Sequence, residues 1–294
     1  MKKKLICLLL TFVMVFSLSA CGSKNATTGN TAADNTDATV TNAPANSGGS
    51  TEDTSLQYIK DRGKLILGLD DSFPPMGFRD DSNNIVGFDI DLAKEVAKKL
   101  GVELVLQPIS WDAKDTELST KNIDCIWNGF SITPEREKNL TMSMPYMENK
   151  IALVVKNNSD IQSMADMKGK SLAVQSGSSA EEALNSDANK AFKDSIGQVN
   201  GFSDYETALM DLETGNSEAV LMDSVVANYM ITESGKDYEV LDGSLVAEQY
   251  AIGFRKGDVA LSDAVNNALK ELKADGTVAK ISTQWFGSDL TTIE

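Results

Sequence analysis

The sequence contains no histidine among its 294 residues. Imidazole is the usual general base of enzymes and a common zinc ligand, so its absence removes the Ser-His-Asp and Cys-His arrangements and most zinc sites. The sequence also lacks an acidic loop with the spacing of a calcium site. We therefore expect the protein to need neither a metal ion nor a cofactor.

Cysteine is almost as scarce. Of the three cysteines, Cys7 and Cys21 lie in or directly after an N-terminal apolar run, and Cys125 is the only one in the body of the chain. If Cys7 leaves with a signal peptide and Cys21 is modified, no intramolecular disulfide can form. Cys125 lies in an apolar, strand-like segment at 123–127, where we expect a buried and inert thiol.

Basic residues are outnumbered by acidic ones, 27 against 43, which gives a formal net charge of −16. Nucleic acids and anionic membrane surfaces attract basic patches, so this balance disfavours both as partners of the protein surface. We expect no nucleic-acid partner.

The N-terminus has the features of an export signal. Lysines occupy positions 2–4, an apolar run follows at 5–18, and Ser19-Ala20 leads into Cys21. The run is shorter than the roughly 20 residues that span a bilayer, which favours a signal peptide over a transmembrane helix. Residues 18–21 resemble the bacterial lipobox, which implies a signal peptide at 1–20, lipidation of Cys21 and a location on the outer face of the cell membrane. An ordinary signal peptide cleaved near Ala20 is the alternative.

The segment that follows has little to bury. Val40 is the only large apolar residue in 22–54, and the segment has no aromatic residue. Such a composition does not offset the entropy of ordering, so we expect residues 21–54 to be a disordered tether. Residues 55–294 are then the folded part, long enough for one large domain or two lobes.

Strand-like and helix-like segments alternate along residues 55–294, which predicts an α/β fold with largely parallel sheets. The first unit includes a buried strand at 65–69, a helix at 89–100 with Asp89 as its cap, and a helix that starts at Thr133-Pro134. The alternation restarts after a strand at 151–155, which indicates two lobes. We expect lobe one at 55–153 plus 250–294 and lobe two at 154–249, joined by two crossing segments near 153–156 and 247–250.

Several motifs in this part of the chain together resemble the family 3 solute-binding proteins of polar amino acid ABC transporters. Each motif is modest evidence alone, but they occur in order and at family spacing over essentially all of 55–294. They lie at 68–78, 87–93, 131–136, 143–146, 169–178, 215–223 and 250–287. The resemblance implies a periplasmic-binding-protein-like fold, in which each lobe is a mixed sheet flanked by helices and a two-segment hinge joins the lobes.

A free amino acid is a zwitterion, so its site needs a cation and an anion. Arg136 offers a planar fork that matches a carboxylate. The resemblance implies that Arg136 holds the ligand α-carboxylate and that Asp223 holds the α-ammonium. From position alone, Arg136 is also readable as a solvated helix charge and Asp223 as a helix N-cap.

The resemblance implies further contacts around this pair. Phe73 and Trp111 match positions that sandwich the ligand side chain, and Asp70 matches a position near its distal end. Read without the family, the two aromatic residues fit a core and Asp70 fits a turn. The remaining implied contacts come from Asn128, Gly129, Ser131, Gln175, Ser178 and Ser179, of which Gln175 also fits an ordinary surface position.

The implied function is the binding component of an ABC importer. It would act without catalysis, as a monomer, with an amino acid as ligand and a permease as partner. Two alternatives remain: a secreted dehydratase acting on a cyclohexadienyl amino acid, for which the sequence shows no spare carboxyl group, and an extracellular sensor domain. The sequence leaves open which amino acid binds, which permease is the partner, and whether the resting form is open.

Overall fold

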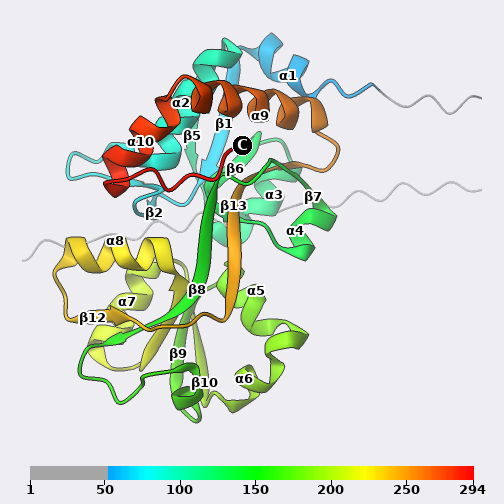
Figure 1. Cartoon of the computed structure of the whole chain (residues 1–294). Coiled ribbons are helices and arrows are strands. Elements are labelled where there is room, and N and C mark those ends of the chain that lie inside the picture. The colour runs from blue at the N-terminus through cyan, green and yellow to red at the C-terminus, as the bar shows by residue number, and fades with distance from the viewer. Residues whose placement is uncertain (1–51) are drawn as a thin grey trace, which may run out of the picture. The chain divides into compact units, whose positions relative to one another are not determined.

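The computed structural model describes residues 52–294, and its strands and helices alternate as the sequence predicts (Figure 1). We define lobe one as the elements built on the sheet with strand order β5-β1-β6-β13. The first three strands are parallel, and β13 is antiparallel to β6, so this sheet is mixed. The bounds are β1 (Lys64–Leu69), β5 (Glu103–Pro108), β6 (Cys125–Ser131) and β13 (Val246–Arg255).

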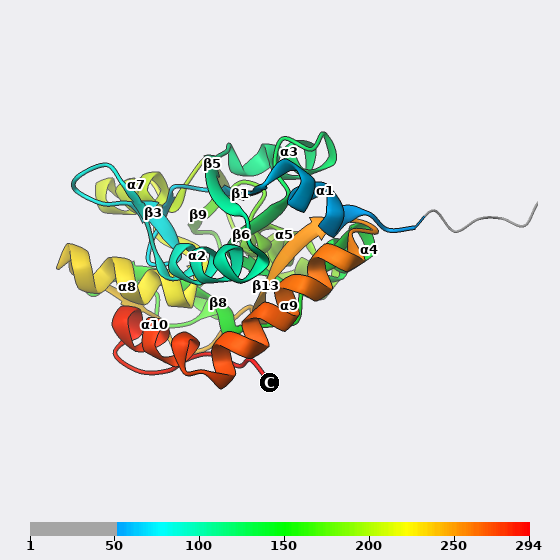
Figure 2. The ribbon, with the colours of Figure 1, turned by 90° about the horizontal axis from the view of Figure 1, so that it is seen from above.

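Both faces of the lobe-one sheet are covered. In β1, Leu65 and Leu67 face one apolar cluster while Ile66 faces the other, as expected for a strand buried on both sides. Figure 2 shows α2, α9 and α10 packed side by side over one face. This layer consists of α1 (Ser55–Arg62), α2 (Phe88–Leu100), α9 (Val259–Ala274) and α10 (Thr277–Phe286). The lobe also contains α3 (Lys114–Ser119), α4 (Pro134–Asn139) and β7 (Leu140–Met142).

Local signals explain where these helices begin and end. The hydroxyl of Thr133 accepts from the backbone N–H of Arg136 and Pro134 is the first helical residue, as the sequence predicts for the start of α4. Gly101, with φ 72°, ends α2. The interpretation of Asp89 as a cap is wrong. Its Oδ2 accepts from the backbone N–H of Gly129 at 2.6 Å and from the hydroxyl of Tyr146 at 2.9 Å, because tertiary partners take this buried carboxylate.

Lobe two repeats the arrangement on strands in the order β10-β9-β11-β8. Three strands are again parallel, and β8 is antiparallel to β11. Apolar residues of α5 belong to the cluster on one face, and those of α7 and α8 to the cluster on the other. The bounds are β8 (Met147–Lys156), β9 (Ser171–Gln175), α5 (Ser179–Asn185), α6 (Lys190–Ser195), β10 (Gln198–Phe202), α7 (Tyr205–Thr214), β11 (Ala219–Asp223), α8 (Ser224–Ser234) and β12 (Tyr238–Val240).

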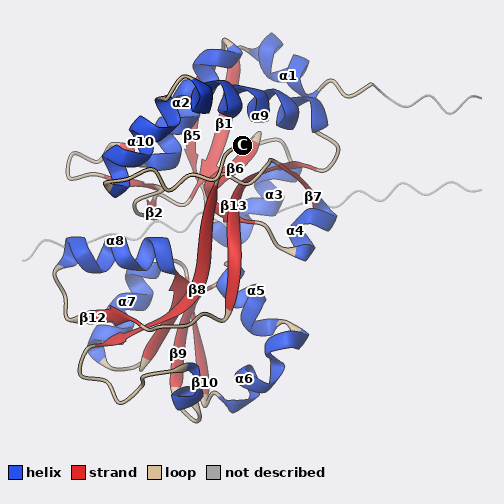
Figure 3. Cartoon of the chain, in the orientation of Figure 1, coloured by secondary structure: helices blue, strands red, loops and turns tan. Residues whose placement is uncertain are grey.

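The long strands β8 and β13 connect the two lobes (Figures 1 and 3). They pair antiparallel from Met147↔Tyr250 to Ile151↔Val246. Beyond this ladder β8 continues along β11 and β13 continues along β6, so one hydrogen-bonded sheet passes through both lobes. The predicted two-lobed α/β fold with a mixed sheet in each lobe is therefore confirmed.

Two further expectations concern Cys125 and the N-terminal end of the folded part. Cys125 is buried and free, as predicted, and burial raises the pKa of its thiol, which makes it unreactive. Asp53, just before α1, accepts from the backbone N–H of Ala260 at 2.5 Å, which ties this end of the described chain to α9. The predicted signal peptide, the lipidated Cys21 and nearly all of the tether lie outside the described residues. Within residues 52–294, every helix is too short or too polar to cross a membrane.

Candidate ligand site between the lobes

The carboxyl ends of the parallel strands of both lobes point toward one region. Asp70 directly follows β1, Ser131 ends β6, Gln175 ends β9 and Asp223 ends β11. In open α/β sheets ligands bind in the crevice outside the carboxyl ends of the strands. The short sheet of β2 (Ser72–Phe73), β3 (Gly77–Arg79) and β4 (Ile85–Val86) adds Phe73 to the same region.

Arg136 is the cation of this region. Its side chain is 8% exposed, and its guanidinium lies 4.0 Å above the ring of Phe130. Nη1 donates to the carbonyl of Ser131 at 2.8 Å, and Nε lies 3.8 Å from Oε2 of Glu182 in lobe two. Burial lowers the pKa of Arg136, but a guanidinium stays charged. The fork is thus fixed by stacking and by one backbone bond, with donors still available for a carboxylate.

Asp223 is the matching anion from lobe two. It occupies the N-cap position of α8, but its side chain makes no capping bond. Instead it accepts from Nδ2 of Asn149 at 2.7 Å, from the hydroxyl of Tyr250 at 2.8 Å and from that of Tyr205 at 3.0 Å. Burial raises the pKa of Asp223, because the charged carboxylate is poorly solvated; the hydrogen bonds from the two phenols and the charge of Arg136 offset this effect only in part. A cation entering the site would relieve this penalty.

Asp70 and Gln175 meet across the lobes. Oδ2 of Asp70 accepts from Nε2 of Gln175 at 2.8 Å, and its Oδ1 accepts from the hydroxyl of Ser72 at 2.6 Å. Burial raises the pKa of Asp70. Asn128 holds the backbone of Asp70 in place, since its Oδ1 accepts from the N–H of Asp70 at 2.9 Å.

Aromatic rings form the walls. Phe73 of lobe one packs on Tyr205 of lobe two with centroids 5.8 Å apart, and Trp111 packs edge-on against Phe130 at 6.0 Å. Gly129 allows this approach: its φ is +57°, and a Cβ there would lie 2.8 Å from Cε1 of Phe73. Only glycine fits this backbone conformation without strain.

The predicted residues surround one small cavity. Its volume is about 10 Å³, close to one water molecule. Of the predicted residues outside the lining, Asp70 and Ser131 bond to Gln175 and Arg136 of the lining, and Asn128 bonds to Asp70. The lining consists of Phe73, Trp111, Gly129, Arg136, Gln175, Ser178, Ser179 and Asp223, all of which are in the predicted set.

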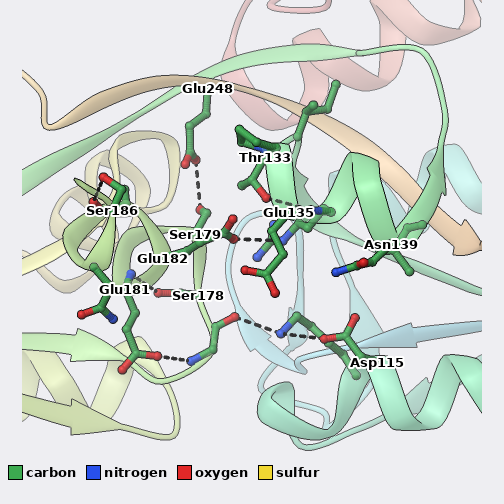
Figure 4. Close-up of a pocket in the computed structure, with 18 of the residues that line it drawn as sticks. Asp115, Thr133, Glu135, Asn139, Ser178, Ser179, Glu181, Glu182, Ser186 and Glu248 are labelled. Carbon is green, nitrogen blue, oxygen red and sulfur yellow. Dashed lines mark hydrogen bonds and ion pairs between the residues drawn. The ribbon is translucent and has the colours of Figure 1, made fainter. Parts of the chain in front are cut away.

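A wider cleft of about 1440 Å³ adjoins this cavity and shares Arg136, Ser178 and Ser179 as walls (Figure 4). It runs between α3 and α4 of lobe one and α5 of lobe two. The wide cleft lacks Asp223 and the aromatic walls, so Arg136 and Asp223 line the small cavity together but not the cleft. We therefore take the small cavity as the site and the cleft as its surroundings.

The two serines at the start of α5 differ in role. Ser178 is the N-cap: its hydroxyl accepts from the N–H of Glu181 at 3.1 Å and donates to the carbonyl of Gln175 at 2.7 Å. The hydroxyl of Ser179 lies 3.0 Å from Oε2 of Glu248 and 3.3 Å from the hydroxyl of Ser131. Ser179 is therefore the serine that reaches across to lobe one.

Sequence reasoning missed four residues of this region. Asn149 and Glu248 are register partners on β8 and β13, Tyr205 begins α7, and Lys114 donates to the carbonyl of Gly177 at 3.0 Å across the lobes. Burial lowers the pKa of Lys114. The available signal was weak, because Glu248 lies beside Gln249 at the polar beginning of β13 and the strand becomes apolar only from Tyr250 to Phe254. The side-chain directions depend on strand register, which the sequence does not give.

This fold and site define a two-lobed α/β binding protein with a charged, aromatic-walled cavity between the lobes. Residues 65–288 match the bacterial extracellular solute-binding proteins, family 3. The chain belongs to this family, as the motifs predict.

Three relatives illustrate the match. The L-cystine-binding protein TcyJ of Escherichia coli (strain K12) is 33% identical over 80% of this chain and 87% of its own length. A substrate-binding protein of an ABC uptake transporter from Streptococcus pneumoniae, solved with bound histidine, is 37% identical with a TM-score of 0.79, over 83% of this chain and 100% of that one. The ancestral amino acid-binding protein AncCDT-1, a precursor of cyclohexadienyl dehydratase, is 36% identical with a TM-score of 0.72, over 79% and 99%.

Proposed function

We propose that the protein captures a polar L-amino acid between its lobes and delivers it to the permease of an ABC transporter. The observation that carries this proposal is the position of Arg136 and Asp223, which come from opposite lobes and line one buried cavity. A carboxylate beside the guanidinium and an ammonium beside Asp223 satisfy both charges. The names of the relatives, which bind cystine and histidine, support the ligand class.

In this proposal the boundaries fall inside the two shared strands, so that lobe one is 55–153 plus 250–294, lobe two is 154–249, and β8 and β13 are the hinge. Because the ligand contacts both lobes, it stabilises the closed arrangement, and the permease can recognise that arrangement. The direct bonds between the lobes, such as Asp70 to Gln175, support this arrangement.

The proposal includes the anchor inferred from the N-terminal sequence. The signal peptide at 1–20 would be removed, Cys21 lipidated and the monomeric binding unit held by residues 21–54 at the outer face of the membrane. Two acyl chains anchor stably where one is marginal. Changing Cys21 to Ser should release the protein into the medium, which fractionation of cells measures.

Calorimetry tests the central claim. The L-amino acids and L-cystine are screened by thermal shift, and the best ligand is titrated into the protein, Arg136→Ala and Lys138→Ala. Loss of one partner of a desolvated charged bond costs about 2–5 kcal/mol, so Arg136→Ala should bind at least about 30-fold more weakly. Lys138, exposed on the same helix, is the matched control and should bind like the wild type. A folded Arg136→Ala that binds within threefold of the wild type would refute the proposed site.

A second candidate function is favoured by one structural observation. Acid catalysis by a dehydratase needs a spare carboxyl group, and the expectation that the site has none is wrong. Glu248 is buried beside the cavity, and burial together with the charge of Asp223 raises its pKa to about 7. We expect no product when the protein is incubated with prephenate or L-arogenate, whereas product that disappears in Glu248→Gln would favour the enzyme.

A further inference from the structure

Glu248 joins the two lobes through one carboxylate oxygen. Its Oε2 accepts from the hydroxyl of Ser131 in lobe one at 2.6 Å and lies 3.0 Å from that of Ser179 in lobe two. Figure 4 shows the side chain of Glu248 extending from β13 and its bond to Ser179. Glu248 is only 7% exposed, so this position is built into the interior of the site.

The same two hydroxyls stand where a ligand carboxylate would need them. Ser131 is adjacent to Arg136, since the guanidinium donates to its carbonyl at 2.8 Å, and Ser179 lines the cavity with Arg136. A hydroxyl has one hydrogen to donate. A ligand carboxylate and an ionised Glu248 would therefore compete for the same donors, and at close range two carboxylates do not both stay ionised.

The charged groups around Glu248 come from three elements. Asp223 on β11 is linked to it through Nδ2 of Asn149, which is 2.7 Å from Asp223 and 3.4 Å from Glu248. Arg136 on α4 is the nearby cation, and Glu182 on α5 lies 3.8 Å from that guanidinium. The phenols of Tyr205 and Tyr250 donate to Asp223 and stay neutral, because burial raises their pKa. One guanidinium thus faces several carboxyl groups, and a further ligand carboxylate adds to this excess.

We propose that Glu248 is a further residue of the binding site, which takes up a proton from solvent when the ligand carboxylate takes over Ser131 and Ser179. The protonated Glu248 then donates its O–H to that carboxylate, and no other bond is made or broken. Where Glu248 is ionised in the free protein, each amino acid is therefore bound together with one proton. This inference rests on the proposed function.

Proton linkage fixes the direction of the pH effect. Burial raises the pKa of Glu248 to about 7 in the protein. Below this pKa the proton is already present, so ligand affinity changes little with pH. Above it each binding event must recruit a proton, so affinity falls as pH rises. Between pH 7 and 8 the expected loss is roughly fivefold, and it approaches tenfold for each further pH unit.

Calorimetry in two buffers with different ionisation enthalpies counts the protons directly. The probes are L-arginine and L-glutamine, whose side chains have no group that titrates near pH 7 or 8, and L-cystine, whose second ammonium titrates near about pH 8. For L-cystine only the difference between the wild type and Glu248→Gln is used. At pH 8 the wild type should take up about one proton more per bound probe than Glu248→Gln. The amide of glutamine can accept from the serines in the free protein and can donate an N–H to the ligand carboxylate without taking up a proton, so Glu248→Gln should bind at pH 8 at least as tightly as the wild type. The control is Glu135→Gln, an exposed carboxylate in the wide cleft, which should show wild-type uptake.

The outcomes separate this inference from the proposed function. Equal proton uptake by the wild type and Glu248→Gln overturns the role of Glu248 while leaving amino acid capture intact. If Glu248→Gln fails to fold, the wild type alone decides: an affinity that is constant from pH 6 to 9 overturns the inference, and a loss that begins near pH 7 with matching uptake supports it. If none of the probes binds the wild type, the proposed function fails and the inference fails with it.

Discussion

Asp124 and Asp223 are both buried carboxylates at the ends of strands, yet they have different surroundings. Asp124 precedes β6 in lobe one, where it pairs with Arg62, accepts from the backbone N–H of Ile66 at 2.7 Å and lies 3.6 Å from Arg255. Asp223 accepts from one amide and two phenols, all neutral. The positive charge that Asp124 needs is supplied by the protein itself. The negative charge of Asp223 is balanced only in part, by Arg136 on the other side of the site.

This difference separates structural from functional use of the same chemical group. A buried carboxylate with its own arginines joins parts of one lobe, and breaking such a pair is costly. A buried carboxylate with only neutral donors lowers stability when charged and gains from an incoming cation. The same substitution, Asp to Asn, should therefore have opposite consequences at the two positions.

The largest effect should come from Asp223→Asn. Its oxygen can accept from Asn149 and Tyr250, and the hydroxyl of Tyr205 can turn to accept from the new amide, so the fold should survive. Loss of the charge removes the partner of the ligand ammonium, which should weaken binding at least about 30-fold. The melting temperature should stay the same or rise, because burial raises the pKa of Asp223 and the folded state disfavours its charge. Affinity is measured by calorimetry and stability by thermal unfolding. A variant that melts far below the wild type would make Asp223 a structural residue like Asp124.

The next effect should be that of Asp124→Asn on stability alone. It leaves Arg62 and Arg255, with side chains 24% and 11% exposed, without their buried partner. Breaking a buried pair costs about 3–5 kcal/mol, and the partial exposure of Arg62 brings the expected loss to about 3 kcal/mol. Urea unfolding measures this loss, and the folded variant should bind within threefold of the wild type. Weak binding by a fully folded Asp124→Asn would remove the distinction between the two carboxylates.

The smallest effect should come from Asp71→Asn, the matched exposed pair. Asp71 bonds to Arg79, and both side chains are well exposed, at 29% and 39%. Exposed ion pairs contribute about 0–1 kcal/mol, so stability should change by less than that in the same urea titration. A loss comparable with that of Asp124→Asn would show that burial is not what separates these pairs.

The sequence predicted the fold because its signals are local. The cap hydroxyl of Thr133 and the ring of Pro134 act within one turn, and a short continuous apolar run marks β1 wherever that strand lies. Asp89 had the same kind of local signal and was misread. A partner far along the chain, the backbone N–H of Gly129, took its carboxylate.

The residues of the site also fall into those that the sequence predicted and those that it did not. Arg136 and Asp223 were identifiable because family motifs fix their positions, and the structure places both at one cavity. Glu248 and Asn149 were missed because they are opposite each other on β8 and β13. Which face of a strand a residue occupies depends on register, and a shift of one residue would turn both side chains away from the site.

The ladder between β8 and β13 also bears on how the chain folds. Its partners, from Met147↔Tyr250 to Ile151↔Val246, are about a hundred residues apart, and everything between them is lobe two. Bringing distant ends together costs entropy that grows with the logarithm of the loop length. Once lobe two has formed, its two ends already lie side by side, so the ladder closes at little further entropic cost. Lobe one cannot complete its sheet before β13 has been synthesised, although its first strands leave the ribosome earliest. We therefore expect folding to begin in the middle of the chain and to finish with lobe one.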